Sequence, residues 1–122
     1  IRRFFRRPSQ PTAATGLHPT ADGLGISPLK GSPSSLFMPW SQVTRAVAFK
    51  RDQYVMDRIC IVFELSNARV LEINEDLQGW EGLVEQLPTH LPGALVYAEW
   101  FDEVAFPAFK TNEKTIFQRV VG

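Results

Sequence analysis

Histidine and cysteine are the residue types that most readily ligate metals or act as nucleophiles, and this chain has only His18, His90 and Cys60. A zinc site needs three or four ligands at suitable spacing, which two distant histidines and one cysteine do not supply. Cys60 stands in an apolar alternating stretch, so we expect a buried structural thiol. No nucleophile-elbow motif supports a Ser-His-Asp arrangement. We therefore expect no catalytic residues, no metal, no cofactor and no enzymatic activity.

Carboxylates gather in the middle of the chain, at Glu72, Glu75, Asp76, Glu81 and Glu85. A calcium loop would place oxygen ligands at alternate positions around a central glycine, and this run does not. Two interpretations remain open. The run is either a solvated face of a capped helix or a surface that binds a protein partner, which would then be basic.

The chain begins with a basic and aromatic segment, residues 1–7, which carries Arg2, Arg3, Arg6 and Arg7. Such a segment can bind anionic lipid headgroups, with about 1 kcal/mol from each basic residue near the surface. It can equally be a first strand, a juxtamembrane tail or a frayed end. We expect no nucleic-acid partner, because the rest of the chain is net acidic and contains no readable recognition module.

The net charge is zero, but the charges are unevenly distributed along the chain. Residues 1–58 hold nine Lys/Arg against three Asp/Glu, whereas residues 64–103 hold nine acidic residues against one basic residue. This asymmetry indicates either an oriented surface field or two segments that neutralise each other in the folded protein. We favour neutralisation, because segments of a sequence need not form separate faces.

The length of 122 residues fits one domain, and the 44% hydrophobic composition suffices for one core. No apolar run approaches the roughly 18 residues that cross a bilayer, and no secretory signal is visible. One cysteine allows no internal disulfide, which fits a reducing compartment. We therefore expect a cytoplasmic protein.

Strands are predicted first, after a loop or linker at residues 8–20. A weak strand over 21–29 and a short one over 36–38 precede two stronger strands over 42–50 and 58–66, and residues 70–73 complete an antiparallel hairpin. The period-two pattern predicts one set of buried side chains: Val43, Val47, Phe49, Ile59, Ile61, Phe63, Leu65, Leu71 and Ile73.

Helical spacing begins at Asn74, and either Asn74 or Asp76 can cap the first turn. The apolar positions of this helix are Leu77, Trp80, Leu83, Val84 and Leu87, and Pro88 should end it. A second, short helix is predicted over 97–104 and a closing strand over 115–121. All three tryptophans, Trp40, Trp80 and Trp100, are expected in the core.

The segment 21–26 leads through a turn to Pro39-Trp40-Ser-Gln-Val43. This arrangement resembles bacterial domains with the pleckstrin-homology-like fold, which often carry a Trp-x-x-Ile/Val step into a long strand. The resemblance covers about residues 21–87 and implies a strongly twisted antiparallel sheet or partial barrel, closed by the helix at 75–87. A further short helix and strand after Pro88 depart from that pattern. The expected organisation is an N-terminal segment and linker, 1–20, and one α+β domain, 21–122.

The leading functional interpretation is a non-catalytic protein-binding module, such as an inhibitor, an immunity-type protein or an adaptor, with an acidic surface. The alternative is a peripheral membrane or regulatory pleckstrin-homology-like domain of a larger membrane-associated protein, which would use the arginine-rich start. An enzyme is the third interpretation.

Overall fold

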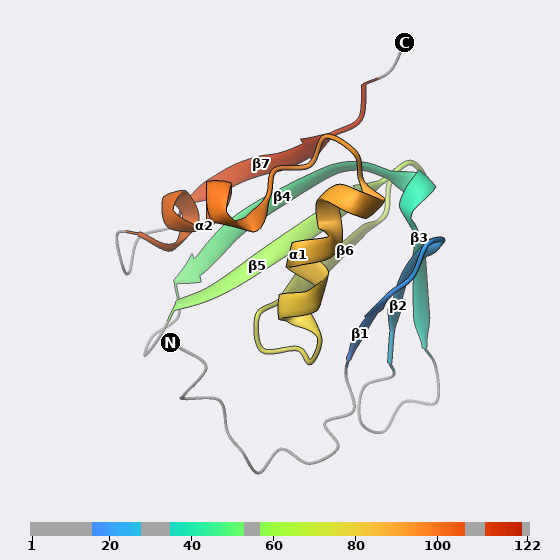
Figure 1. Ribbon diagram of the computed structural model, residues 1–122, viewed down its shortest axis with the longest axis horizontal. Coiled ribbons are helices and arrows are strands. Elements are labelled where there is room, and N and C mark those ends of the chain that lie inside the picture. Colours follow the sequence, from blue (N-terminus) through green and yellow to red (C-terminus); the bar gives the residue numbers. More distant parts are fainter. Residues whose placement is uncertain (1–15, 28–34, 53–56, 107–111, 121–122) are drawn as a thin grey trace.

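The computed structural model describes residues 16–27, 35–52, 57–106 and 112–120. The elements, in chain order, are β1 (Leu17–Pro19), β2 (Gly23–Ile26), β3 (Leu36–Pro39), a 3-10 turn (Trp40–Gln42), β4 (Val43–Asp52), β5 (Asp57–Leu65), β6 (Val70–Asn74), α1 (Trp80–His90), α2 (Tyr97–Ala105) and β7 (Glu113–Gln118). Figure 1 shows both helices on one face of the sheet that contains β4 and β5.

The strands form two separate antiparallel sheets, so the α+β class is confirmed. One sheet has the order β1-β2-β3 and the other has the order β6-β5-β4-β7. The predicted hairpin of β5 and β6 is present, and the C-terminal strand β7 pairs with β4. The two sheets are not closed into a barrel.

A corner joins the two sheets at the Trp40–Val43 step, where the chain passes from β3 into the 10-residue strand β4. The indole Nε1 of Trp40 donates a hydrogen bond to the Thr20 carbonyl at 2.7 Å. From the far end of β7, Arg119 donates to the carbonyls of Val43 at 2.8 Å and Trp40 at 3.0 Å. These bonds satisfy backbone acceptors where the two ladders end.

The inward face of β4 differs from the predicted one. Val43 points into the core as expected, but the pairing with β5 shifts between Val43 and Arg45. A bulge of this kind moves every later side chain to the opposite face. Ala46, Ala48 and Lys50 are therefore the residues of β4 that face inward.

The outer face of β4 consequently carries two apolar side chains that were predicted for the core. Val47 is buried and Phe49 is half-buried, and they pair with Val62 and Cys60 of β5. Arg51 lies over the Phe49 ring, with its guanidinium carbon 5.2 Å from the ring centroid. The long stem of an arginine can shield apolar area in this way while its charged end stays in water.

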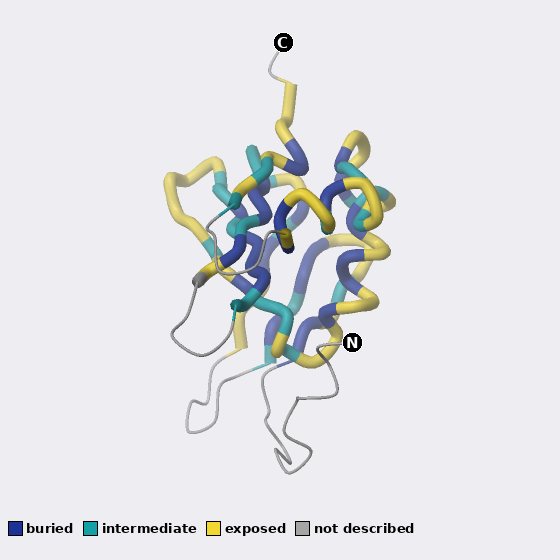
Figure 2. The backbone as a smooth tube through the Cα atoms, turned by 90° about the vertical axis from the view of Figure 1, so that its left-hand side faces the viewer, coloured by how far each residue is buried: buried dark blue, intermediate teal, exposed yellow. Residues whose placement is uncertain are grey.

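One hydrophobic core joins the inner faces of both sheets and both helices, and Figure 2 shows the buried chain at the centre. All three tryptophans belong to it, as predicted. Of the predicted strand set, five residues are buried in this core and two, Leu65 and Leu71, are half-buried against it. The five are Val43, Ile59, Ile61, Phe63 and Ile73.

Strand β1 lies within the stretch that was predicted to be a loop or linker. It pairs with β2, and Leu17 N donates to the Gln78 carbonyl at 2.7 Å, just before α1. β2 is a weak strand signal in the sequence, and Gln78 is distant from β1 along the chain. The three residues of β1, Leu-His-Pro, also carry no strand pattern of their own, so the sequence did not predict this strand.

The predicted boundaries of the first helix are wrong at both ends. The Oδ1 atom of Asn74 accepts a hydrogen bond from Asp76 N at 2.9 Å, which builds a turn rather than a helix cap. The helix starts only at Trp80, after Gly79 with φ of 89°. Pro88 lies inside the helix instead of ending it, and Leu91 N bonds to Leu87 O at 2.7 Å. Pro88 has no N–H to donate to the Val84 carbonyl, so this turn of the helix lacks one backbone hydrogen bond.

Gly79 is required at its position, and we expect Gly79→Ala to lower the free energy of unfolding by about 1–3 kcal/mol. A Cβ at Gly79 would lie 2.5 Å from the Leu17 carbonyl oxygen, in a left-handed backbone conformation that alanine adopts poorly. Gly82→Ala is the matched control. It has room for a methyl group and should raise stability by up to about 1 kcal/mol through helix propensity. Urea denaturation of both variants measures the two signs, and a neutral Gly79→Ala would contradict the required geometry.

The second helix and the closing strand fall close to their predicted positions. α2 buries Trp100 and Val104, and β7 buries Ile116 and Phe117. Within the described ranges, none of the helices is long and apolar enough to span a membrane.

Candidate functional site

Lys50 is the one charged residue that is fully buried in the described part of the chain, with 1% of its surface exposed. Its Nζ donates a hydrogen bond to the Ala105 carbonyl at 2.9 Å and lies 3.4 Å from Oδ2 of Asp57. The bulge in β4 turns Lys50 inward, so the alternation in the sequence placed it on the wrong face. No local signal in the sequence marks this residue.

Lys50 belongs to a polar cluster at the C-terminal end of α2. Asn112 Nδ2 donates to the Val104 and Phe106 carbonyls at 3.3 and 3.0 Å, and Lys50 N donates to Asn112 O at 2.9 Å. The last carbonyls of a helix lack intrahelical partners and carry partial negative charge. The cluster therefore supplies hydrogen-bond donors and a positive charge to the carbonyls at the C-terminal end of α2.

A buried lysine amine can also act as a base or nucleophile when its charge is suppressed. Here the amine contacts a carbonyl and a carboxylate and is closed off from solvent. We therefore assign Lys50 and Asp57 a structural role, which is to hold α2 against the end of β4.

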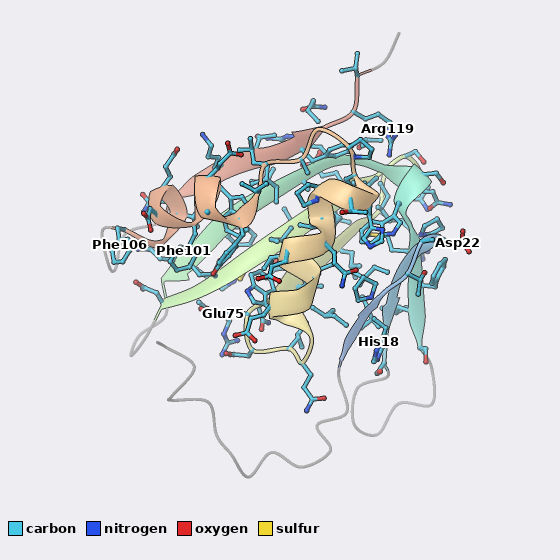
Figure 3. All side chains as sticks on the ribbon, viewed as in Figure 1. His18, Asp22, Glu75, Phe101, Phe106 and Arg119 are labelled. Carbon is cyan, nitrogen blue, oxygen red and sulfur yellow. The ribbon has the colours of Figure 1, made fainter. Side chains whose placement is uncertain are left out.

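His18 and Ser27 form the described arrangement that most resembles catalytic chemistry. His18 Nε2 and Ser27 Oγ are 2.6 Å apart, a distance at which an imidazole could accept the hydroxyl proton. Among the described residues no carboxylate is hydrogen-bonded to the other ring nitrogen. Figure 3 shows His18 on the three-stranded sheet and Glu75 near the start of α1. The pair therefore lacks the orienting acid of a triad.

His90 lies in a different environment, at the end of α1. Its ring stacks on Trp40 at a centroid distance of 4.9 Å and an interplanar angle of 7°, and Nε2 lies 3.1 Å from Gln86 Oε1. The two histidines thus have separate partners. The described residues contain no group of three or more His, Cys, Asp or Glu residues placed to hold a metal ion.

Cys60 is 1% exposed and pairs with Phe49 and Asn74 on the outer face of the sheet. Burial raises the pKa of its thiol from 9.0 to about 11, and the neighbouring carboxylate of Glu72 adds to this. The thiol is therefore protonated at neutral pH, which suits the structural role that was expected.

The raised pKa gives a direct expectation for thiol reactivity. At pH 8 the native protein should react with iodoacetamide about a hundredfold more slowly than the protein in denaturant, because the thiolate fraction falls about a hundredfold when the pKa rises by two units. Mass spectrometry of quenched samples measures both rates. Equal rates would show that the thiol is accessible and ionises normally.

The structure separates the five carboxylates that the sequence placed in one run. Glu72 pairs with Arg51 across the sheet, with oxygen–nitrogen distances of 2.8 and 2.9 Å. Asp76 Oδ2 lies 2.9 Å from Arg58 Nε, and Glu75 Oε2 accepts a hydrogen bond from Ile59 N at 2.9 Å. The remaining two, Glu81 and Glu85, are exposed on α1.

Ion pairs between distant parts of the chain also offset part of its charge asymmetry. Besides the pairs of Glu72 and Asp76, Arg45 contacts Glu64 at 2.9 Å, and Lys114 contacts Glu103 at 3.0 Å. In each pair a cation from outside residues 64–103 meets a carboxylate from within them. These contacts support neutralisation between the two segments.

Exposed carboxylates also lie on the two helices. The sequence contains no Lys or Arg between Arg69 and Lys110. The exposed sides of α1 and α2, here called the acidic helix face, carry Glu81, Glu85, Glu99, Asp102 and Glu103. Glu99 Oε1 also accepts a hydrogen bond from Val96 N at 3.2 Å, which caps α2. Figure 3 shows Phe101 and Phe106 toward the far end of α2.

The other predicted binding residues, Arg2, Arg3, Arg6 and Arg7, lie outside the described residues. Comparison of the chain with protein-family models, curated proteins and solved structures finds no match.

Proposed function

We propose that this domain is a non-catalytic protein-binding module that binds a basic protein through the acidic helix face. An inhibitor, an immunity-type protein and an adaptor are the forms that fit. The observation that carries the proposal is the absence of any Lys or Arg from residues 70–109, which include both helices and their exposed carboxylates.

The structure narrows the residues that would serve this function. Glu72 and Asp76 already contact arginines, so they contribute less to an external partner than the sequence suggested. Glu81 and Glu85 are four residues apart on an exposed helix side. Like charges at this spacing repel by a few tenths of a kcal/mol, and a lysine or arginine from a partner would relieve that repulsion.

The test starts with a partner isolated by affinity capture, whose binding is then measured to Glu81→Lys/Glu85→Lys. We expect about a tenfold loss of affinity, equal to about 1.4 kcal/mol. The matched control is Asp22→Lys/Glu113→Lys, which makes the same change in net charge at exposed positions on strands and turns. The control should lose much less affinity, because its carboxylates lie outside the acidic helix face.

Ionic strength supplies a second readout for the same variants. Screening weakens exposed charge pairs and acts mainly on the association rate. The parent protein should therefore bind more weakly as salt rises, and the α1 variant should show a shallower dependence. Identical affinity and salt dependence in the parent and the α1 variant would show that the acidic helix face is only a solvated surface. Strong binding to anionic vesicles that is lost on Arg2→Ser/Arg3→Ser/Arg6→Ser/Arg7→Ser would favour the membrane function instead.

We also propose that the arrangement is pleckstrin-homology-like. Support comes from the two antiparallel sheets, from the Trp40–Val43 step between them and from α1, whose apolar side belongs to the same core as both sheets. The test is a comparison of an experimental structure of the whole chain with solved domains of that fold. A different order of strands would overturn the assignment.

A further inference from the structure

The free edge of β6 can be located from the hydrogen bonds at the two ends of its ladder. β6 is the last strand in the order of the four-stranded sheet, beside β5 (Figure 1). Leu65 N donates to the Arg69 carbonyl at 2.9 Å before β6 begins, and Glu75 N donates to the Ile59 carbonyl at 3.0 Å after β6 ends. Residues of an antiparallel strand face their partner strand alternately, so the odd-numbered residues of β6 bond to β5. The even-numbered residues direct their N–H and C=O groups to the free edge.

Val70 and Glu72 present unused backbone groups at this edge. The next even-numbered residue, Asn74, differs because its carbonyl accepts a hydrogen bond from Leu77 N at 3.2 Å. Within the described ranges, the N–H and C=O groups of Val70 and Glu72 have no backbone partner. The edge is also open to solvent, since Val70 is 65% exposed. Donors and acceptors therefore alternate along an accessible edge, and a further strand can pair with such an arrangement.

The edges of β7 and β1 are covered by other parts of the fold. Leu95 N donates to the Ile116 carbonyl at 2.9 Å, which occupies part of the edge of β7. Leu17 N donates to the Gln78 carbonyl at 2.7 Å, which occupies part of the edge of β1. Both strands therefore already use groups that an added strand would need.

The edge of β3 is blocked by a proline. Trp40 N donates to the Asp22 carbonyl at 3.2 Å, so the alternate positions Phe37 and Pro39 face away from β2. Pro39 has no N–H to offer there, and natural sheets protect their edges in this way. β6 contains no proline. Among the strands that the structure describes, β6 thus has the edge that is neither covered nor blocked.

A second copy of β6 is complementary to this edge across a two-fold axis. Two antiparallel β6 strands can place Val70 of each copy opposite Glu72 of the other copy. Each of these two pairs then exchanges both of its hydrogen bonds, and all the free groups of Val70 and Glu72 gain partners. Leu71 faces its own counterpart on the axis, at a Cα separation of about 4.5 Å. Its side chain is half-buried in one copy, so this contact removes more of it from water.

Charge does not oppose this register. Glu72 lies opposite Val70 and not opposite the second Glu72, and like charges destabilise a sheet mainly when they are directly opposite. Arg51 also contacts the Glu72 carboxylate at 2.8 and 2.9 Å within each copy. A second copy further supplies a strand that is already extended and fixed, so it avoids the ordering cost of a flexible peptide.

We propose that this chain forms a two-fold symmetric dimer through β6, which joins the two four-stranded sheets into one continuous sheet. The dimer uses a sheet edge and not the acidic helix face. It therefore does not depend on the proposed function.

Sedimentation equilibrium of the full chain over about 10 μM to 1 mM tests the dimer, because a small interface associates in this range. Val70→Pro removes one edge donor from each copy at the first position of β6, where a proline leaves the ladder to β5 intact. We expect it to raise the dissociation constant at least about tenfold. Val70→Ala is the matched control, since it keeps the N–H and should change the constant less than about threefold. A parent chain that stays monomeric over the whole range, or a dimer that Val70→Pro does not weaken, would overturn the proposal.

Cross-linking tests the register. Leu71→Cys places two thiols on the axis within disulfide reach, so glutathione disulfide should convert this variant to a covalent dimer. Ser66→Cys is the matched control, because it is exposed at the tip of the hairpin and far from the axis. The native Cys60 is buried and does not contribute. Equal cross-linking of the two variants would show that the copies meet by random collision or through another surface, and the proposal would fail.

Hydrogen exchange of the parent chain tests the edge without any substitution, and so decides the matter if Val70→Pro does not fold. The amides of Val70 and Glu72 should exchange about tenfold more slowly when about nine tenths of the chains are dimeric, because exchange then requires the monomer. The Phe37 amide, at the edge of β3, should exchange at the same rate at every concentration. If the amides of Val70 and Glu72 also ignore concentration, β6 does not pair with a second copy.

Discussion

Lys50→Ala is expected to lower the free energy of unfolding by about 3–5 kcal/mol, which approaches the whole stability of a small domain. The substitution leaves the Asp57 carboxylate, which is 14% exposed, without the cation 3.4 Å away. It also removes the hydrogen bond from Nζ to the Ala105 carbonyl at the end of α2. A largely buried carboxylate that loses a counter-ion is costly, because little water can reach it to replace the lost contact. Urea denaturation followed by circular dichroism measures the loss.

Two further variants separate charge from packing at this site. Lys50→Met keeps most of the side-chain volume, and Lys50→Met/Asp57→Asn also removes the carboxylate charge. The double variant should be more stable than Lys50→Met alone, because removing both charges costs less free energy than leaving the Asp57 carboxylate without this cation. Lys114→Ala is the exposed control, since its 3.0 Å pair with Glu103 lies in water and should contribute less than about 1 kcal/mol. A Lys50→Ala variant as stable as Lys114→Ala would contradict the structural role.

Short-range patterns in the sequence were sufficient for several elements. The alternation of Ile59, Ile61 and Phe63 predicted β5, and the spacing of Trp100 and Val104 predicted α2. Both patterns repeat over neighbouring residues that face one core. Such patterns do not depend on which distant segment packs against them.

The face of β4 could not be predicted, because a single extra residue changes the alternation. Val47 and Phe49 have larger apolar side chains than Ala46 and Ala48, and Lys50 is charged, yet Ala46, Ala48 and Lys50 face the core. The pairing of Ala46 with Phe63 and of Ala48 with Ile61 fixes that choice. Small residues on β4 leave room for the large side chains of β5, and this is a property of the pair of strands.

The site residues were predictable only in part, for a similar reason. The sequence grouped the five carboxylates in one run, with Glu72 on a predicted strand and the other four on the predicted helix. The outward position of Glu72 follows from the pairing of Val62 with Glu72, and Arg51 reaches it from the far side of β5. Lys50 gave no signal at all, because its partners at Asp57 and Ala105 come together only in the folded chain.

Phe63→Ala should lower the free energy of unfolding by about 3–5 kcal/mol through loss of buried area and the cavity left behind. Phe63 is fully buried in the centre of β5, where it pairs with Ala46 on one side and Leu71 on the other. Neither neighbour in the sheet is large enough to fill the space of a missing ring. This loss approaches the whole stability of a small domain. The measurement therefore also records the fraction of the Phe63→Ala protein that is folded without denaturant.

Val62→Ala is the matched control, since Val62 is adjacent in β5 but points to the outer face and is half-buried. It should cost less than about 1.5 kcal/mol, because less area is lost and the space opens to solvent. If Phe63→Ala does not fold, Phe63→Leu gives a measurable variant that keeps most of the apolar volume and should lose about 1–2 kcal/mol. The inward face of β5 would be assigned incorrectly if Phe63→Ala were as stable as the parent and if Phe63→Leu lost no more free energy of unfolding than Val62→Ala.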